Sequence, residues 1–374
     1  MNTGEYLDMS DTIDRREFIR RVLALSAAGA ALSLAGCAPR SAGGEATSTS
    51  AQAASPTDAG PAHAAEAPKP SATSGQSEAA PQPTAAPTQG QEPTVAPPNP
   101  ASGSAYLAVA RGAGADPAEL TRRAIAAVGG IERFVKPGAR VIVKPNICNA
   151  YHGPEYASTT NPIVVATIVT LCKGAGATSV QVMDFPFGGT PQASYTKSGI
   201  EEAVKAAGGE MVVMSPIKYR EIAIPQGKAL KKGKFYGDML DADAVINVPI
   251  AKHHSSAGLT LGMKNLMGTV LDRNGMHARG LHQTIADINS ALRPQLTVVD
   301  AIRILTANGP TGGNLDDVKQ MDTIIASADV VAADAYATTL FGKTARDIAY
   351  IQMGAEMGLG QMDLGAIKVE EIAV

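Results

Sequence analysis

Between residues 104 and 374, short runs of β-branched and aliphatic residues alternate with longer helical patterns. Short apolar runs bounded by turn residues are typical of buried strands, whereas helices show a period near 3.6 residues. A chain that alternates strand and helix favours a sheet with parallel strands covered by helices. We therefore predict an α/β domain with a largely parallel or mixed sheet flanked by helices. The predicted strands are 140–143, 179–183, 210–213, 244–248, 296–299 and 323–326.

Two of the predicted helices carry clear start signals. The run 116–119 (Asp-Pro-Ala-Glu) has the pattern of a capping box with Pro at the first helical position. Asn161 followed by Pro162 starts a second helix, which we expect to end near 174–176. Further helical patterns cover 201–207 and 285–292.

The first 37 residues carry the pattern of a bacterial secretory signal. Arg15 and Arg16 precede a short apolar run, 22–35, which leads through Leu-Ala-Gly to Cys37. The arginine pair indicates the twin-arginine route for folded cargo, and the run into Cys37 looks like a lipobox whose cysteine is acylated. A membrane-spanning helix needs about 20 apolar residues, and this run is shorter. We predict that 1–37 is a twin-arginine signal with a lipobox, so the protein is exported by that machinery and lipid-anchored outside the cytoplasm, on the periplasmic or extracellular face of the cell membrane.

Residues 38–103 consist largely of Ala, Pro, Ser, Thr, Gly and Gln. Such a segment buries too little apolar surface to offset the entropy of ordering the chain. We predict a disordered tether that joins the lipid anchor to the α/β domain.

Charge and cysteine content exclude some functions of the domain at 104–374. It has nearly equal numbers of acidic and basic residues and no basic stripe, so we expect no nucleic-acid partner. Beyond Cys37 the chain contains only Cys148 and Cys172, too few for a four-cysteine iron–sulfur or zinc site. We therefore expect no intrinsic iron–sulfur cluster. The pair forms either a disulfide, which an oxidising compartment permits, or two buried free thiols.

Four predicted strands run directly into polar or ionisable residues. One leads to Lys144 and Asn146, a second to Asp184, a third to 252–254 (Lys-His-His), and a fourth to Asp300. In open α/β sheets ligands bind beyond the carboxyl ends of the strands. One such carboxylate alone often caps the next turn, but four such ends on one edge predict a functional site.

The densest group of such residues lies in a glycine-interrupted segment from 252 to 279. Imidazole groups transfer protons near neutral pH and bind transition metals, and Lys and Arg attract anions. Apolar residues alternate with the charges, so we predict a loop that lines a basic pocket with apolar walls. His277 and His282 are five residues apart, which does not match the spacing of the zinc-binding helix motif. The polar members are Lys252, His253, His254, Lys264, Asn265, Arg273 and His277, with His282 just beyond.

Thr159 and Thr160 precede the helix that starts at Asn161. The amino end of a helix is a ready anion site, so these hydroxyls are candidate ligand contacts. Plain N-capping by Asn161 explains the same pattern equally well.

Several separate motifs occur in the order found in one known family. Together they resemble the bacterial and archaeal family called domain of unknown function 362, over about residues 105–330. The resemblance implies no settled activity. Many members of that family bear ferredoxin-like cysteine clusters, which this chain lacks, so a role in electron transfer would have to come from a redox partner protein. The motifs are 143–146 (Val-Lys-Pro-Asn), 159–162 (Thr-Thr-Asn-Pro), 246–249 (Ile-Asn-Val-Pro), 252–254 (Lys-His-His), 264–268 (Lys-Asn-Leu-Met-Gly) and 300–302 (Asp-Ala-Ile).

A weaker resemblance concerns the stretch from His254 to Lys264. Its His-x-x-Ala-Gly and Gly-x-Lys elements are similar to a stretch of lactate racemase-type enzymes, in which a lysine carries a nickel-pincer nucleotide. That resemblance implies that Lys264 holds such a cofactor and that His254 is the acid/base. It further implies that His277 or His282 faces the metal.

Three functions are compatible with these patterns. The first is an enzyme, racemase- or isomerase-like, that acts on a small anionic organic molecule. The second is a surface-tethered protein that binds a solute or cofactor, and the third is an accessory subunit of a membrane redox complex. The predicted catalytic residues are His254, Lys264, Lys252 and Asp300. The predicted ligand-binding residues are Lys144, Asn146, Thr159, Thr160, Asp184, Lys252, His253, Asn265 and Arg273.

Overall fold

The computed structural model describes residues 106–374. The predicted signal, lipid-anchor site and tether therefore lie outside the described residues. Within the described part, no helix is both long and apolar enough to cross a membrane.

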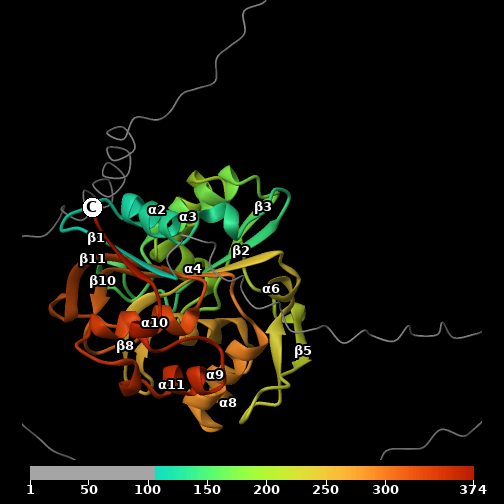
Figure 1. Ribbon diagram of the computed structural model, residues 1–374. Helices are drawn as coiled ribbons and strands as arrows, with labels where there is room; N and C mark the ends of the chain where they lie inside the picture. The colour runs from blue at the N-terminus through green and yellow to red at the C-terminus, as the bar shows by residue number, and fades with distance from the viewer. Residues whose placement is uncertain (1–105) are drawn as a thin grey trace, which may run out of the picture. The chain divides into compact units, whose positions relative to one another are not determined.

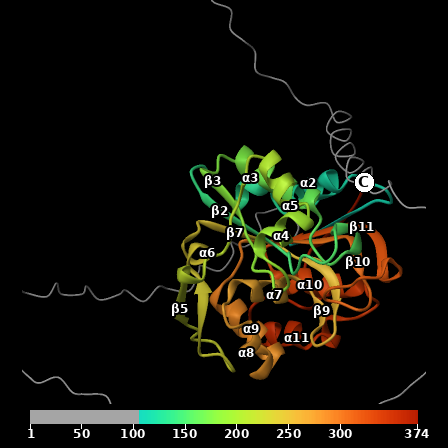
Figure 2. The ribbon, with the colours of Figure 1, turned by 180° about the vertical axis from the view of Figure 1, so that it is seen from behind.

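A ten-stranded sheet forms the centre of the described part (Figures 1 and 2). Its main path has the order β12-β1-β11-β10-β7-β2-β3-β4, and β8 pairs with both β10 and β9. The strands are β1 (Leu107–Arg111), β2 (Arg140–Pro145), β3 (Ser179–Val182), β4 (Glu210–Met211), β7 (Ala244–Val248), β8 (Ile250–His254), β9 (Gly258–Thr260), β10 (Leu296–Leu305), β11 (Val318–Ser327) and β12 (Val369–Ala373).

The sheet is mixed but mostly parallel. The strands from β10 through β7, β2 and β3 to β4 are all parallel neighbours, whereas β11 is antiparallel to both β1 and β10. This confirms the predicted architecture. Because β2, β3 and β7 run in one direction, their carboxyl ends meet at one edge, where ligands bind in open α/β sheets.

Helices cover both faces of the sheet, and Figures 1 and 2 show them as two layers. One layer contains α2 (Pro117–Ala127), α3 (Pro162–Gly174), α4 (Pro191–Lys197) and α5 (Ile200–Ala206). The other contains α7 (Gly262–Asn265), α8 (Arg273–Ala278), α9 (Leu281–Ala291), α10 (Val330–Thr339) and α11 (Ala349–Glu356). A separate hairpin of β5 (Tyr219–Ala223) and β6 (Lys232–Tyr236), followed by α6 (Gly237–Asp241), lies beside them.

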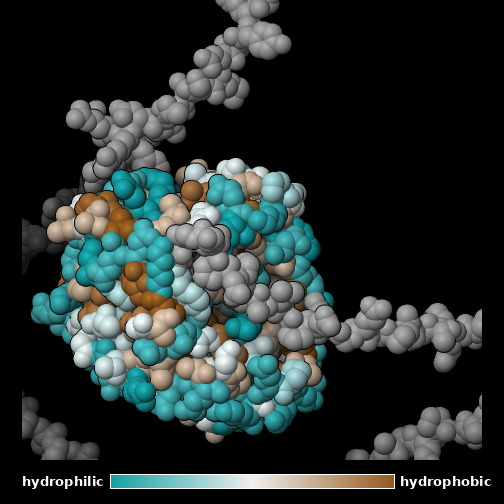
Figure 3. Space-filling model, viewed as in Figure 1, coloured by the Kyte–Doolittle hydropathy of each residue, from teal (hydrophilic) through white to brown (hydrophobic). Residues whose placement is uncertain are grey.

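Successive side chains of a strand point to opposite faces of the sheet, and the two cores show this period of two. In β2, Val141 and Val143 pack in the core under α3, whereas Ile142 belongs to the core under α9 to α11. In β10, Val298 and Ile302 lie in the first core. Burial on both faces explains why these strands read as continuous apolar runs. The face seen in Figure 3 is mainly hydrophilic, with small separate hydrophobic patches.

One predicted strand end and one predicted loop were wrong. The strand predicted at 296–299 does not end there but continues as β10 to Leu305, because β11 pairs with it over that length. Asp300 therefore lies within a strand and not at its end. The segment predicted as a loop from 252 to 279 begins inside β8 and continues through β9, α7, a 3₁₀ turn (Leu266–Thr269) and α8. Leu259, Leu261 and Met263 were expected to form apolar walls of the pocket, but they are buried in the core under α9 to α11.

The predicted helix starts are confirmed, with one change. Asp116 accepts a hydrogen bond from Ala118 N and caps α2, and Asn161 accepts one from Ile163 N and caps α3. The capping box was wrong, because the Glu119 carboxylate pairs with arginines one turn later on its own helix. Cys148 and Cys172 are both free and buried, which resolves the alternatives left open by the sequence.

Candidate functional site

A cavity of about 540 Å³ lies where the carboxyl ends of β2 and β3 meet β8, α7 and α8. It brings together most of the side chains predicted from the sequence, although they lie far apart along the chain. The predicted residues that line it are Lys144, Asn146, Asp184, Lys252, His254, Lys264, Asn265, Arg273 and His277.

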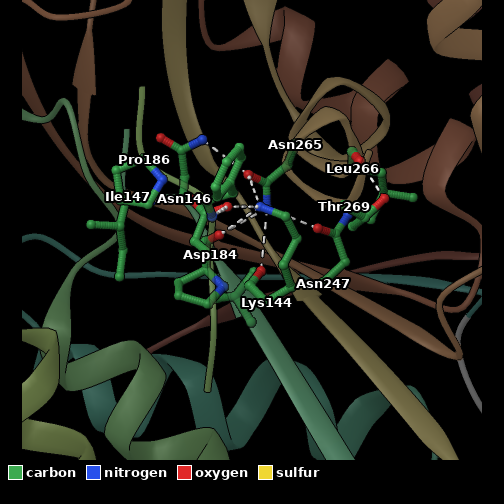
Figure 4. Close-up of polar contacts among 12 residues, drawn as sticks. Lys144, Asn146, Ile147, Asp184, Pro186, Asn247, Asn265, Leu266 and Thr269 are labelled. Atoms are coloured by element: carbon green, nitrogen blue, oxygen red, sulfur yellow. Dashed lines mark hydrogen bonds and ion pairs between the residues drawn. The ribbon is translucent and has the colours of Figure 1, made fainter. Parts of the chain in front are cut away.

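A buried ion pair between Lys144 and Asp184 forms the floor of the site (Figure 4). Lys144 Nζ donates to Asp184 Oδ1 at 2.7 Å and to Asn265 Oδ1 at 3.1 Å. Burial lowers the pKa of Lys144, while the Asp184 carboxylate acts in the opposite direction. A buried charge is costly unless it is paired and hydrogen-bonded, and here the lysine has both kinds of partner.

Asp184 also connects the ends of two strands. Its Oδ2 accepts from Ile147 N at 2.6 Å, just beyond β2, and its Oδ1 accepts from Phe185 N at 2.8 Å, just beyond β3. Both carboxylate oxygens are therefore occupied by groups of this chain. Asp184 accordingly holds the floor of the cavity together and leaves little capacity for a ligand.

The register of β2 and β7 explains why the polar side chains of the floor meet. Lys144 on β2 is opposite Asn247 on β7, so their side chains emerge on the same face of the sheet. Asn265 Nδ2 donates to Asn247 Oδ1 at 2.9 Å, and Asn247 Nδ2 donates to the Gly262 carbonyl at 2.9 Å. These amides attach α7 to the sheet and place Lys264 at the cavity.

Three further cations line the cavity without a carboxylate partner in the described residues. Lys252 Nζ donates to the carbonyls of Ser158 at 2.6 Å and Pro310 at 2.9 Å. Arg273 donates to the Phe185 carbonyl at 2.5 Å, and its guanidinium carbon lies 4.5 Å from the centre of the Phe185 ring. Asp184, the one carboxylate in the lining, is already bound to Lys144. The third of these cations is Lys264.

Lys264 is buried, and its amine donates to the Met267 thioether at 3.5 Å. Burial lowers the pKa of Lys264 to about 7, and repulsion from Lys252 and Arg273 adds to the effect. An amine in this state changes charge near neutral pH, which is a property of lysines that bind or react with ligands.

His254 lies on β8, two residues from Lys252, so both side chains emerge on the same side of the strand. The pKa of His254 is lowered to about 3, mainly by burial and also by the positive charges of Lys264 and Lys252. Its Nδ1 lies 3.2 Å from Ser256 N and 3.3 Å from Ser256 Oγ, which orients the ring. His254 is therefore a neutral imidazole at neutral pH, the form that accepts a proton.

Two buried polar atoms of the lining have no hydrogen-bond partner within residues 106–374. They are Asn146 Oδ1, which can only accept, and Thr260 Oγ1, which can donate and accept. Buried polar groups are satisfied in most proteins, so each unpartnered group needs an explanation. Together with the Lys264 amine, they indicate that a polar ligand completes this cavity.

The part of the chain that contains the cavity residues also matches a known protein family. The family model described as domain of unknown function (DUF362) matches residues 141–339, more than half of the chain. The chain belongs to this family. A thylakoid-associated protein of Synechocystis sp. is 28% identical over 221 residues, a match that covers 55% of this chain and 64% of that protein. The DUF362 chain thus spans less than two thirds of the length of this curated relative.

Two solved structures show weaker likeness to this DUF362 chain. The lactate racemase apoprotein from Thermoanaerobacterium thermosaccharolyticum has 16% sequence identity and a TM-score of 0.33, over 59% of this chain and 53% of the other. A structural-genomics target protein from Thermotoga maritima has 13% identity and a TM-score of 0.38, over 60% and 58%. These values are too low to transfer an activity or a cofactor.

Four predicted residues of the DUF362 motifs do not line the cavity: Asp300, Thr160, Thr159 and His253. Asp300 lies on the sheet face covered by α3, where it accepts from Asn161 N at 2.6 Å and Ile302 N at 3.0 Å. Burial raises the pKa of Asp300 to about 6. Thr160 Oγ1 donates to the Val248 carbonyl, and Thr159 Oγ1 donates to the Asn146 carbonyl. These contacts support the backbone below the cavity.

The histidines named from the sequence separate in space. His277 lines the cavity with His254, whereas His253 and His282 do not. His253 Nδ1 accepts from Gly309 N at 3.1 Å, and the His282 ring stacks on Tyr350 with centroids 6.3 Å apart. Among residues 106–374, no group of three or more His, Cys, Asp or Glu side chains is placed to hold a metal ion. The nickel-pincer nucleotide on Lys264 stays a prediction from the sequence.

Sequence reasoning missed several residues of the lining. The most informative is Cys148, which follows Lys144 and Asn146 at steps of two and lies on the same side of the extended chain. This period was a usable signal, because Ile147 between them packs in the opposite core. The other missed lining residues are Phe185, Pro186, Phe187, Asn274 and Pro310. Thr260, Met267 and Gly268 also line the cavity, and they belong to the segment 252–279 that was predicted to do so.

Proposed function

We propose that this DUF362 protein is an enzyme that holds a small anionic organic molecule in the cavity and transfers a proton on it. The observation that carries the proposal is the group of Lys252, Lys264 and Arg273, three cations that share a cavity whose single carboxylate is already paired. Clefts lined by one sign of charge raise the local concentration of the opposite ion. The ligand's negative charge would supply the partner that these side chains lack.

The roles follow from position and charge. Lys252, Lys264 and Arg273 hold the anionic group, and His254 takes or returns the proton. A bound anion offsets the repulsion from the lysines and so raises the pKa of His254 towards the range in which imidazole works as a base. Asp184 keeps Lys144 in place and does not react.

Exchange of carbon-bound hydrogen with solvent tests this proposal. The purified protein is incubated in D₂O with a panel of small carboxylates, and loss of each C–H signal is followed by proton NMR. We expect exchange of at least one compound, and His254→Ala should slow it by about 10²–10⁴-fold, the usual contribution of a positioned acid or base. His253→Ala is the matched control, because the His253 ring lies outside the cavity. If both variants lost the same fraction of the exchange rate, the role of His254 would be contradicted.

A binding protein without catalysis is the second candidate, supported by the same unpaired cations. It predicts saturable capture of an anion by the wild type, loss of capture in Lys264→Met, and no exchange with any compound of the panel. That combination of results would show that the protein binds a solute without catalysis, and the enzyme proposal would be abandoned.

We also propose that the protein works outside the cytoplasm, attached to a membrane by a lipid on Cys37. The support is the sequence alone: Arg15 and Arg16 before a short apolar run, and the small residues before Cys37.

A further inference from the structure

Cys148 is the one thiol of the described residues that lines the cavity. Its Sγ accepts a hydrogen bond from Lys252 Nζ at 3.3 Å and another from Asn149 Nδ2 at 3.0 Å. The thiol itself donates to the Ser158 carbonyl at 3.3 Å. Two donors, one of them cationic, therefore point at this sulfur from within hydrogen-bond distance. Such surroundings favour a thiol that reacts as a nucleophile.

The second cysteine of the described residues has the opposite surroundings. Cys172 is fully buried on α3 among the aliphatic residues of the core. Burial raises the pKa of Cys172 to about 12, which makes its thiol inert at neutral pH. The fold therefore contains an internal control for any measurement made on Cys148.

The cavity around Cys148 also shows independent signs of a ligand. The Lys264 amine is buried and donates to a thioether, and Asn146 Oδ1 and Thr260 Oγ1 are buried without a hydrogen-bond partner in the described part of the chain. All three groups line the same cavity as the sulfur. A molecule that satisfies them lies within reach of the thiol.

We propose that Cys148 is a nucleophile that forms a covalent bond with an electrophilic carbon of the anionic ligand. This inference rests on the proposed function, because Lys264 and Arg273 are taken to hold the ligand's negative charge. The thiol proton first leaves to solvent, and the thiolate then attacks a carbon that carries a leaving group. The C–S bond forms as the bond to the leaving group breaks, and the leaving group departs with the electron pair. The positive charge of Lys252 lies beside the sulfur throughout.

Alkylation with two reagents of matched size tests the proposal. Iodoacetate is an anion and iodoacetamide is neutral, and both transfer a two-carbon group to a thiolate with loss of iodide. The folded, full chain is treated with each reagent, and modification of each cysteine is followed by peptide mass spectrometry. We expect both reagents to modify Cys148 and to spare Cys172. Relative to the urea-unfolded chain, preference for iodoacetate at Cys148 should rise by about tenfold or more, as an electropositive cleft concentrates anions.

Two variants test separately whether the cavity holds an anion and whether Lys252 makes the Cys148 sulfur reactive. Lys264→Met should abolish the preference for iodoacetate while Cys148 still reacts with iodoacetamide. Lys252→Met should slow both reagents at Cys148, because it removes the cation next to the sulfur. Thermal unfolding checks that each variant is folded, and the comparison of the two cysteines in the wild type decides the matter if a variant is not.

Two results would overturn the inference, and they differ in what else they affect. If Cys148 and Cys172 react equally slowly with both reagents, Cys148 is not a nucleophile. The proposed function is not affected by that result, because hydrogen exchange tests it separately. If Cys148 reacts with the same reagent preference as the unfolded chain, the cavity does not hold an anion beside the thiol, and the proposed function loses its basis as well.

Discussion

Three cations of the cavity, all except Lys144, lose water on burial without gaining a carboxylate partner among the described residues. Lys252 and Arg273 replace that water with backbone carbonyls, whereas the Lys264 amine has a thioether, a much poorer acceptor. Lys144 differs from all three because Asp184 is its partner. The arrangement is typical of a site that is completed by its ligand, since a buried charge without a partner lowers stability.

Anion affinity should depend on pH through Lys264. Its pKa is about 7, so the group is charged and attractive below that value and neutral above it. His254, with a pKa of about 3, stays neutral over the same range. We expect sulfate, whose charge is constant here, to bind about tenfold more weakly at pH 8 than at pH 6, because protonation of one group changes by that factor. Isothermal titration calorimetry measures both constants.

Lys264→Met is the matching variant for this experiment. It should bind sulfate weakly and with nearly the same constant at both pH values. A wild-type affinity that is equal at pH 6 and pH 8 would contradict the assignment of the titrating group to Lys264.

At the scale of elements, the turn after α7 packs directly on the buried ion pair. A Cβ atom on Gly268 would lie 2.4 Å from Asp184 Oδ1 and 2.9 Å from Lys144 Nζ. No side chain fits there unless the pair moves. We expect Gly268→Ala to lower the free energy of unfolding by about 1–3 kcal/mol, the usual cost of overpacking a core. Urea unfolding of the full chain measures this change.

Gly174→Ala provides the control for that substitution. Gly174 is the last residue of α3, and a Cβ there meets no atom within 4 Å. Alanine in a helix is more favourable than glycine by about 0.5–1 kcal/mol, so this variant should be unchanged or more stable. A Gly268→Ala protein as stable as Gly174→Ala would mean that the ion pair tolerates displacement.

The element that sequence reasoning described least well is β8. Treating 252–254 as part of a loop gave His253 and His254 the same expectation of facing a ligand. In a strand, neighbouring side chains point to opposite sides, so Lys252 and His254 line the cavity and His253 does not. The same reasoning applies to β10: its extension places Asp300 under α3.

At the scale of the whole molecule, the export proposal makes separate predictions for routing and anchoring. Replacing Arg15 and Arg16 together by lysine should keep the protein in the cytoplasm, because the receptor reads the arginine pair. Cys37→Ser should leave export intact but move the protein from the membrane fraction to the soluble fraction, because it removes the buried acyl chains. Cell fractionation with immunoblotting measures both. A Cys37→Ser protein that stays in the membrane fraction would contradict lipid anchoring.

The α/β class, the caps at Asp116 and Asn161, and the meeting of the strand-end residues Lys144, Asp184 and Lys252 were predictable from the sequence. These features depend on residues close together in the chain, where periodicity and turn chemistry act. The structure was needed to find the strand order, the ion pair across 40 residues between Lys144 and Asp184, and the lowered pKa of Lys264. Each of these arises from packing between segments far apart in the chain, and local patterns carry no information about which distant segments will meet.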